Sequence, residues 1–117
     1  MSQSTPTDLY AVADFCLVPM GTAEPSVAEY VAECSRVLEK TGLKHKLHGY
    51  GTNIEGPWSA VMQAIHDCHT AVHTKGAPRI ATDIRIGTRV DRTIEPGTGN
   101  ESKVKRVEEI LARDQKA

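Results

Sequence analysis

Asn53 and Glu55 are the two residues of this chain whose types and spacing best fit ligand-binding chemistry. They lie in a short stretch between glycines that predicts a strand over about residues 52–55. Side chains two positions apart on a strand point to the same face of its sheet. A carboxylate accepts hydrogen bonds from amino groups or protonated ring nitrogens, and an amide both donates and accepts them. The pair therefore predicts a site for a neutral or cationic heteroaromatic ligand with ring nitrogens.

Two large aromatic side chains flank this stretch. Tyr50 precedes it and Trp58 follows it, and either ring offers a plane for stacking with a heteroaromatic ligand. A structural alternative stays open for the polar pair. In that alternative Glu55 only interacts with the N-terminus of the helix that follows, where negative charge is favoured, and Asn53 only stabilises a turn.

The sequence predicts no metal site, no cofactor and no catalytic residue. His66, His69 and His73 share one side of a predicted helix, a spacing that can bind zinc or copper. A strip of histidines beside an apolar stripe is, however, typical of a solvated or interface edge. Asp83 and Arg85 share one face of a predicted strand, where they form ion pairs or contribute to the ligand site.

Composition excludes several classes of protein. The chain has 117 residues, 25% of them charged, and a net charge of −1, which predicts one globular domain and no nucleic-acid partner. No apolar run approaches the roughly 18 residues that span a bilayer, so no membrane partner is expected. Three cysteines without C-x-x-C spacing and a polar N-terminus without a signal-peptide pattern predict a cytosolic protein.

Hydrophobic periodicity predicts the order β-α-β-β-α-β followed by a C-terminal helix. The expected strands are residues 11–20, 43–48, 52–55 and 79–91, and the expected helices are residues 26–41, 57–75 and 101–113. The first helix should begin with a capping box at Ser26–Glu29. Residues 1–8 are expected to form a disordered tail and residues 9–114 a single domain. This is the order of a ferredoxin-like sandwich, an α+β fold with two helices on one face of an antiparallel sheet.

The first predicted strand is apolar on both of its faces. Phe15 and Leu17 share one face, and Cys16 and Val18 share the other. A strand of this kind is normally buried on both sides, but two helices cover only one face of a sheet. The uncovered face is therefore expected to contact another copy of the chain. The sequence leaves open whether the C-terminal helix packs on its own subunit or on a neighbouring one.

Three stretches of the chain resemble a known family. They are residues 18–22, with the pattern V-P-M-G-T, residues 51–58, with the pattern G-T-N-I-E-G-P-W, and residues 79–89. Together they resemble the small thiamine-binding family of the YkoF-like superfamily, over about residues 10–112. The chain is most similar to the fungal-type members.

The resemblance implies a ferredoxin-like subunit, a homotetramer assembled as a dimer of dimers through sheet faces, and no assigned catalysis. It also implies that the ligand is thiamine or its hydroxymethylpyrimidine half. The ligand-binding residues expected on this basis are Tyr50, Thr52, Asn53, Glu55, Trp58 and Asp83, with Glu55 and Asn53 at the pyrimidine edge. Two alternatives stay open: a structural or partner-binding tetramer without a bound vitamin, and an enzyme acting on a thiamine-related substrate.

Overall fold

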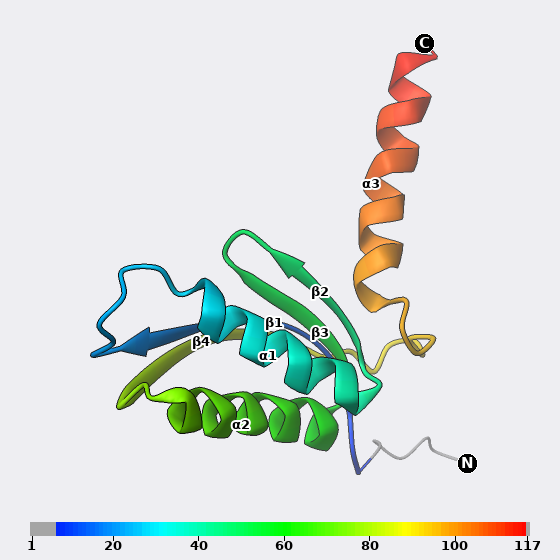
Figure 1. Cartoon of the computed structure of the whole chain (residues 1–117). Helices are drawn as coiled ribbons and strands as arrows, with labels where there is room; N and C mark the ends of the chain where they lie inside the picture. Colours follow the sequence, from blue (N-terminus) through cyan, green and yellow to red (C-terminus); the bar gives the residue numbers. More distant parts are fainter. Residues whose placement is uncertain (1–6, 117) are drawn as a thin grey trace.

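The computed structural model describes residues 7–116, which form four strands and three helices in the predicted order (Figure 1). The elements are β1 (Tyr10–Met20), α1 (Ala28–Thr41), β2 (Lys44–His48), β3 (Gly51–Pro57), α2 (Trp58–Lys75), β4 (Arg79–Gly87) and α3 (Gly99–Gln115). The strands pair antiparallel in the order β2-β3-β1-β4. The predicted α+β class and the ferredoxin-like element order are confirmed.

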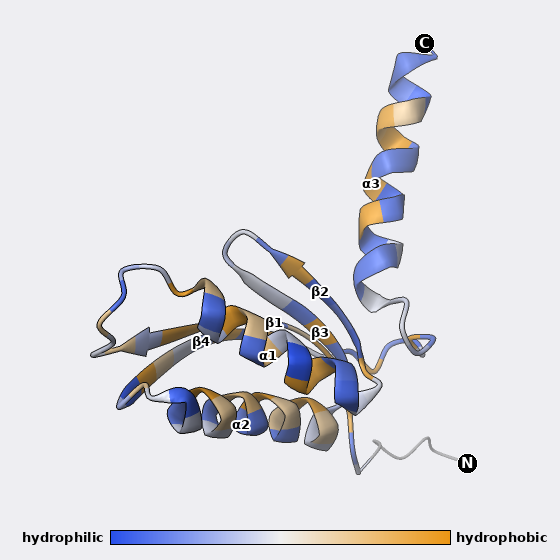
Figure 2. Ribbon diagram, in the orientation of Figure 1, coloured by the Kyte–Doolittle hydropathy of each residue, from blue (hydrophilic) through white to orange (hydrophobic). Residues whose placement is uncertain are grey.

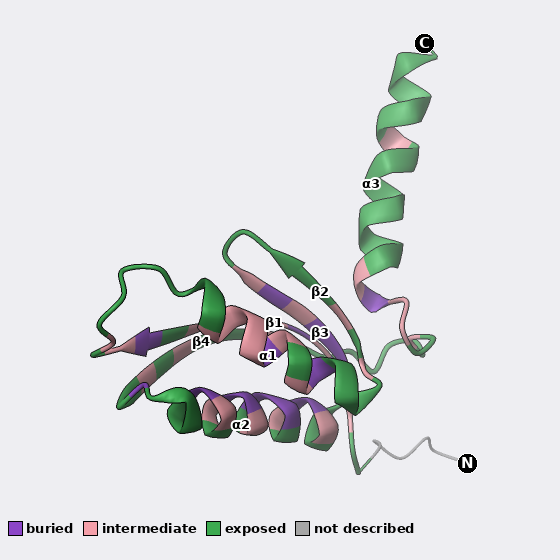
Figure 3. Cartoon of the chain, viewed as in Figure 1, coloured by how far each residue is buried: buried purple, intermediate pink, exposed green. Residues whose placement is uncertain are grey.

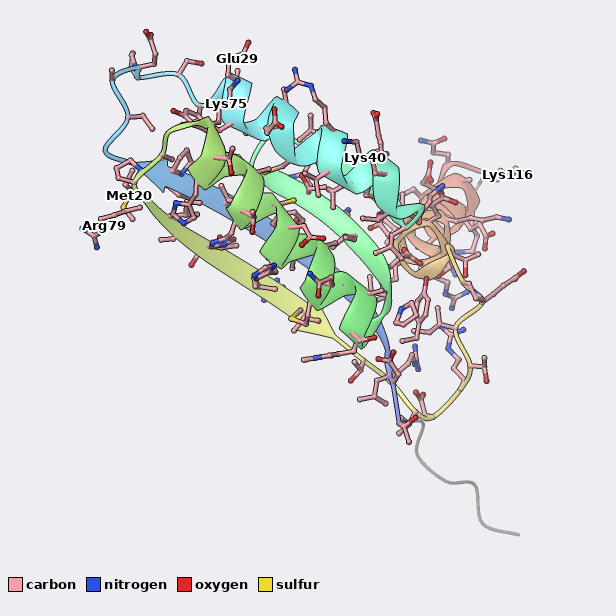
Figure 4. All side chains as sticks on the ribbon, turned by 60° about the horizontal axis from the view of Figure 1, so that its bottom comes forward. Met20, Glu29, Lys40, Lys75, Arg79 and Lys116 are labelled. Carbon is pink, nitrogen blue, oxygen red and sulfur yellow. The ribbon has the colours of Figure 1, made fainter. Side chains whose placement is uncertain are left out.

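The two helices α1 and α2 lie side by side on one face of the sheet (Figure 4). Ala13 of β1 pairs with Ile54 on one side and Ile86 on the other, so these three side chains share a face. That face is the one covered by the helices, because the core joins buried residues of the strands with buried residues of α1 and α2. The buried residues of both helices are coloured in Figure 3. The core residues are Ala11, Ala13, Phe15, Cys34, Leu38, Ile54, Val61, Ala64, Ile65, Cys68, Val72 and Ala77.

The cysteines of the described residues are free thiols. Cys34 and Cys68 are buried in the core, and the Cys68 thiol lies 3.8 Å from the carbonyl oxygen of Cys34. The contact with Cys34 and burial raise the pKa of the Cys68 thiol. Cys68 is therefore a small hydrophobic residue with a weak donor, and a nucleophilic role does not fit it.

Two predicted boundaries are wrong. β4 ends at Gly87 and not at Asp91, because its pairing with β1 ends at Val12. The capping box does not form either. The helix begins at Ala28 without a side-chain cap, and Glu29 instead lies 3.7 Å from Lys75 at the end of α2.

The start of the described chain is hydrogen-bonded to the first turn of α2. Residues 1–6 of the predicted tail lie outside the described residues. Asp8 lies within them and accepts hydrogen bonds from the backbone N–H and the hydroxyl of Ser59, at 3.0 and 2.6 Å. These bonds supply the first turn of α2 with an acceptor that Pro57, at its N-cap position, cannot provide.

The second face of the sheet carries no helix packed along it within residues 7–116. One row of facing residues crosses all four strands there and consists of Lys46, Asn53, Asp14 and Arg85. The strand β1 adds apolar side chains to this open face. Val12 and Cys16 are half-buried and Val18 is exposed, so in a single chain β1 is well buried only on its helix-covered side.

The helix α3 begins on this open face and then projects away from the rest of the chain (Figure 1). Viewed from the side of α1 and α2, it is seen end-on beyond the Lys40 end of α1 (Figure 4). Gly99, at its start, is buried, whereas most of its later residues are exposed. None of the helices in the described part of the chain has both the length and the apolarity to cross a membrane.

Candidate functional site

A cavity of about 780 Å³ lies between α1 and the hairpin formed by β2 and β3. This volume is within the range of small-molecule sites, and its lining has the usual mixture of an apolar majority and a few polar groups. The apolar lining comes from three elements. It includes Phe15, Leu17, Val18 and Pro19 of β1, Val27, Ala28, Val31 and Ala32 at the start of α1, and Leu47 and Tyr50 of the hairpin.

The cavity exists because β1 is longer than the strand beside it. β1 pairs with β3 only as far as Phe15 but with β4 as far as Met20. The second half of β1 therefore has a space where a continuation of β3 would lie, and α1 covers that space. The hairpin enters the sheet at Gly51, where a Cβ atom would lie 2.5 Å from the carbonyl oxygen of Phe15. Only glycine allows this close approach.

Polar residues lie around the apolar lining, with Ser26 and Ser35 of the segment that leads into and forms α1 among them. Arg36 and Glu39 of α1 supply the single permanent cation and the single carboxylate of the lining. The hydroxyl-bearing Thr52 is buried at 6% exposure. His48, at the end of β2, holds the hairpin turn in place: its Nδ1 accepts the backbone N–H of Tyr50 at 3.2 Å, and its Nε2 lies 2.6 Å from Asp14.

The sequence-predicted site residues divide between the two faces of the sheet. Tyr50 and Thr52 line the cavity beside α1. Asn53 and Glu55 belong to a smaller groove of about 250 Å³ on the open face, next to the N-terminus of α3. Their shared face is the one that the spacing of two predicts, but it is not the face that carries the cavity.

Trp58 and Asp83 line neither space. Trp58 is the first residue of α2 and is 40% exposed. Asp83 lies on the open face of β4, opposite Cys16. The fold therefore brings together only part of the predicted set.

Glu55 is a buried carboxylate whose hydrogen bonds are made within the chain. It is 3% exposed and accepts hydrogen bonds from the Tyr10 hydroxyl at 2.7 Å and from the backbone N–H groups of Gly99 and Asn100 at 2.7 and 3.0 Å. Gly99 and Asn100 form the first turn of α3, where free N–H groups favour a negative charge. Glu55 thus caps α3 and not the helix that directly follows it in the sequence.

Tyr10 links the same carboxylate to the loop before α3, because its hydroxyl also accepts the backbone N–H of Gly97 at 2.8 Å. Burial, together with the hydrogen bond to Glu55, raises the pKa of Tyr10 to about 12. An unfolded tyrosine has a pKa of about 10. The folded chain therefore holds this proton more tightly than the unfolded chain does, and the associated stability is complete below about pH 10 and is lost as the pH rises through about 12.

We expect Tyr10→Phe to remove this part of the alkaline pH dependence. Denaturant unfolding at about pH 9, 10 and 11 measures it: the free energy of unfolding of wild type should fall more steeply above pH 10 than that of the variant. Tyr50→Phe, at a side chain that is 89% exposed, is the matched control and should keep the wild-type slope. Equal slopes for wild type and Tyr10→Phe would contradict the prediction.

The histidines of α2 interact with their own chain. His69 Nε2 lies 2.7 Å from the hydroxyl of Thr82, and His73 Nδ1 lies 2.8 Å from the carbonyl oxygen of Ala77. Burial, with His73 and His66 nearby, lowers the pKa of His69. Between residues 7 and 116, no group of three or more His, Cys, Asp or Glu side chains is placed to hold a metal ion.

Sequence reasoning missed most of the cavity lining and the partners of Glu55, and three of these residues show why. Tyr10 and Gly99 are brought to Glu55 only by the pairing of β1 with β3 and the return of the chain after β4. Glu39 is one of several acidic residues on α1, and only its place in the cavity lining distinguishes it. No local pattern in the sequence marks any of the three.

The chain is similar to known proteins of one family. The family model described as "Thiamine-binding protein" matches residues 13–112. A UPF0045 protein of Synechocystis sp. is 54% identical over 100 residues, which cover 86% of this chain and 78% of that protein. A UPF0045 protein of the fungus Eremothecium gossypii is 43% identical over 84 residues, which cover 72% of this chain and 80% of that protein.

Solved structures have the same fold. A hypothetical protein of Methanocaldococcus jannascii superposes with a TM-score of 0.73 at 27% identity, covering 86% of this chain and 97% of that one. A Thermotoga maritima protein, provisionally assigned to thiamine biosynthesis or salvage, superposes with a TM-score of 0.64 at 13% identity. The alignment with the latter covers 80% of this chain and 98% of that one, and it supports the fold alone.

Proposed function

Because the chain belongs to the thiamine-binding protein family, we propose that it is a cytosolic, homo-oligomeric protein that binds thiamine or its hydroxymethylpyrimidine half without transforming it. The observation that carries the proposal is the 780 Å³ cavity between α1 and the β2–β3 hairpin. The description of the matching family model supports a small-molecule binding role. The free cysteines support a reducing compartment.

The lining of the cavity suits an aminopyrimidine joined to a cation. Its apolar walls can pack against both faces of a flat ring, and Tyr50 can stack on it from the hairpin. Thr52, buried at the base, offers a hydroxyl that both donates and accepts hydrogen bonds. Glu39, the single carboxylate of the lining, complements the positive charge of the thiazolium ring. The cation of the lining, Arg36, is paired with Glu33 at 2.6 Å.

We therefore expect calorimetric titration to detect thiamine binding that Glu39→Gln weakens about threefold. The expected factor is modest because Glu39 is exposed, and exposed charge pairs contribute roughly 0.2–1 kcal/mol. Hydroxymethylpyrimidine lacks the permanent charge, so its affinity should be the same for wild type and Glu39→Gln. Glu29→Gln, on the same helix but outside the cavity, is the control and should bind both compounds as wild type does.

Three outcomes would contradict the proposal. The absence of heat with both compounds would remove thiamine as the ligand. An equal loss of affinity for both compounds in Glu39→Gln would remove the assigned role of its charge. Consumption of thiamine during long incubation with the protein would indicate an enzyme and not a binding protein.

Self-association is the second part of the proposal. The open face of the sheet carries Val12, Cys16 and Val18 between rows of charged side chains, and no element of residues 7–116 packs along it. Half-buried apolar side chains on an uncovered sheet favour a partner surface. We propose that copies of the chain associate through this face into a homotetramer, a dimer of dimers.

A further inference from the structure

The turn that closes the β2–β3 hairpin is not one of the turn types that favour a hairpin. His48 pairs with Gly51, so the turn consists of Gly49 and Tyr50 alone. Two-residue turns that match the twist of the strands need a positive φ at their first central residue, yet Gly49 and Tyr50 both have a negative φ. The turn also lacks strongly apolar residues, as its pale colour in Figure 2 shows. Other contacts must therefore hold the turn in place.

The side chain of His48 supplies such contacts from within the hairpin. The backbone N–H of Tyr50 donates to His48 Nδ1 at 3.2 Å, in the manner of an Asx turn, where a side chain accepts the N–H two residues further on. The other ring nitrogen, Nε2, lies 2.6 Å from a carboxylate oxygen of Asp14. The same oxygen lies beside the start of β3, since a Cβ atom on Gly51 would be 3.4 Å from it. His48 thus connects the turn to β1.

These two bonds determine which nitrogen of His48 carries a proton. A backbone N–H can only donate, so Nδ1 must be without a proton to accept from Tyr50. Nε2 then carries the single proton of the neutral ring and donates to Asp14. In a doubly protonated ring Nδ1 is also a donor, and two donors form no hydrogen bond with each other. A protonated His48 therefore keeps its contact with Asp14 but loses the one with Tyr50.

The charged groups around His48 belong to its own strand and to three neighbouring elements. They are Asp14 of β1, Lys46 of β2, Arg85 of β4, which is paired with Asp14, and Arg36 and Glu39 of α1, which share the cavity lining with His48. Asp14 contacts the ring in either charge state, so the bond that depends on the charge is the one to Tyr50. Histidine side chains change charge between about pH 5 and 8, and the bond to Tyr50 should therefore depend on pH in this range.

The turn forms one wall of the ligand cavity. The lining of the cavity includes Leu47, His48, Gly49, Tyr50, Gly51 and Thr52. Tyr50 is 89% exposed, so its ring is scarcely packed and the hydrogen bond to its N–H fixes its backbone. Loss of that bond frees the turn, and ordering the turn again around a ligand costs part of the binding free energy.

We propose that His48 is a positioning residue for the ligand of this cavity. Its neutral ring holds the hairpin turn in the ligand-binding conformation, and its protonation releases the turn and weakens binding. The inference rests on the proposed function, since it concerns thiamine in the cavity beside α1. It adds a residue that acts through the backbone of Tyr50 and a direction, because affinity falls as the pH falls.

Calorimetric titration with thiamine at about pH 8 and about pH 5 tests this role. Wild type should bind about fivefold more weakly at the lower pH, a factor within the range that the loss of one hydrogen bond produces. His48→Ala should already show this loss at the higher pH. His48→Asn should restore the affinity that His48→Ala loses and should lack the pH dependence, because an asparagine side chain accepts the same N–H at either pH.

His66→Asn is the matched control for these variants. His66 is an exposed histidine of α2 outside the cavity, and its replacement should leave the wild-type pH profile unchanged. A pH effect that wild type and His48→Asn share belongs to other groups, so the signal is the difference between these two proteins. Circular dichroism checks the fold of every variant.

Nuclear magnetic resonance of the ligand-free protein gives a second readout. At about pH 8 the ring nitrogen signals of His48 should show a proton on Nε2 and none on Nδ1. The amide signal of Tyr50 should shift as the ring gains its second proton, and in His48→Asn it should not follow this titration. A proton on Nδ1 at the higher pH, or a Tyr50 amide that does not respond to pH, would overturn the inference.

The two measurements separate this inference from the proposed function. Equal pH dependence of thiamine affinity in wild type and His48→Asn would overturn the role of His48 and leave thiamine binding intact. The absence of heat at both pH values would overturn thiamine binding. The signals of the ligand-free protein would then still decide whether His48 controls the turn.

Discussion

Replacing Glu55 with alanine is expected to lower the free energy of unfolding by about 3 kcal/mol, the size of effect seen when one partner of a buried charged hydrogen-bond group is removed. The substitution leaves the hydroxyl of Tyr10 and the N–H groups of Gly99 and Asn100 without their acceptor. Denaturant unfolding at neutral pH measures the change. Hydrogen exchange should also show faster exchange of the amides in the first turn of α3.

Asp14→Ala is the control for this prediction. Asp14 is a carboxylate on the same face of the sheet, but its side chain is 46% exposed and its partner is His48 at 2.6 Å. A pair with this exposure contributes roughly 1 kcal/mol or less, so the loss of stability should be much smaller. A wild-type free energy of unfolding for Glu55→Ala would mean that α3 is not held through this carboxylate.

Filling the cavity beside α1 is expected to abolish thiamine binding or to weaken it at least about 100-fold, which corresponds to roughly 2.8 kcal/mol. Ala32→Trp places an indole ring in the space that the pyrimidine would occupy. The position is only partly buried on α1, so the larger side chain can enter the cavity without displacing the core. Calorimetric titration measures the affinity, and circular dichroism checks the fold.

Two further variants locate the ligand. Ala112→Trp adds the same side chain to exposed α3 and should bind thiamine as wild type does. Asn53→Ala alters the groove on the open face and should also leave the affinity unchanged. Normal binding by Ala32→Trp together with weak binding by Asn53→Ala would indicate that thiamine binds in the groove beside Glu55 and not in the cavity.

Much of the fold could be predicted from local patterns. Gly42 ends α1 in the left-handed conformation, with a φ of 75°, as its position after the apolar stripe indicates. The alternation of β1 and β4 predicts which side chains share a face. The end of β4 could not be predicted in this way. Its alternating pattern continues beyond Gly87, but the strand stops there because its pairing with β1 ends at Val12, although β1 itself continues to Tyr10 beside β3.

The candidate site was harder to predict because it depends on contacts between distant segments. The sequence predicts that Glu55 binds a ligand or, in the structural alternative, that it interacts with the helix next to it. Its backbone donors instead lie 44 and 45 positions further along the chain. The cavity depends on where β3 stops relative to β1 and on how α1 lies over that gap. Neither property belongs to a single stretch of sequence.

The extra length of β1 has a consequence for recognition. After Phe15, the main chain of β1 has no strand partner on the side of the cavity within the described residues, while Leu17, Val18 and Pro19 line that cavity. Peptide N–H and C=O groups on such an unpaired edge are available for hydrogen bonds with a planar ligand that has alternating donors and acceptors. Every amino acid carries the same peptide groups. A ligand bound through the main chain of β1 therefore keeps these hydrogen bonds when the surrounding side chains are replaced.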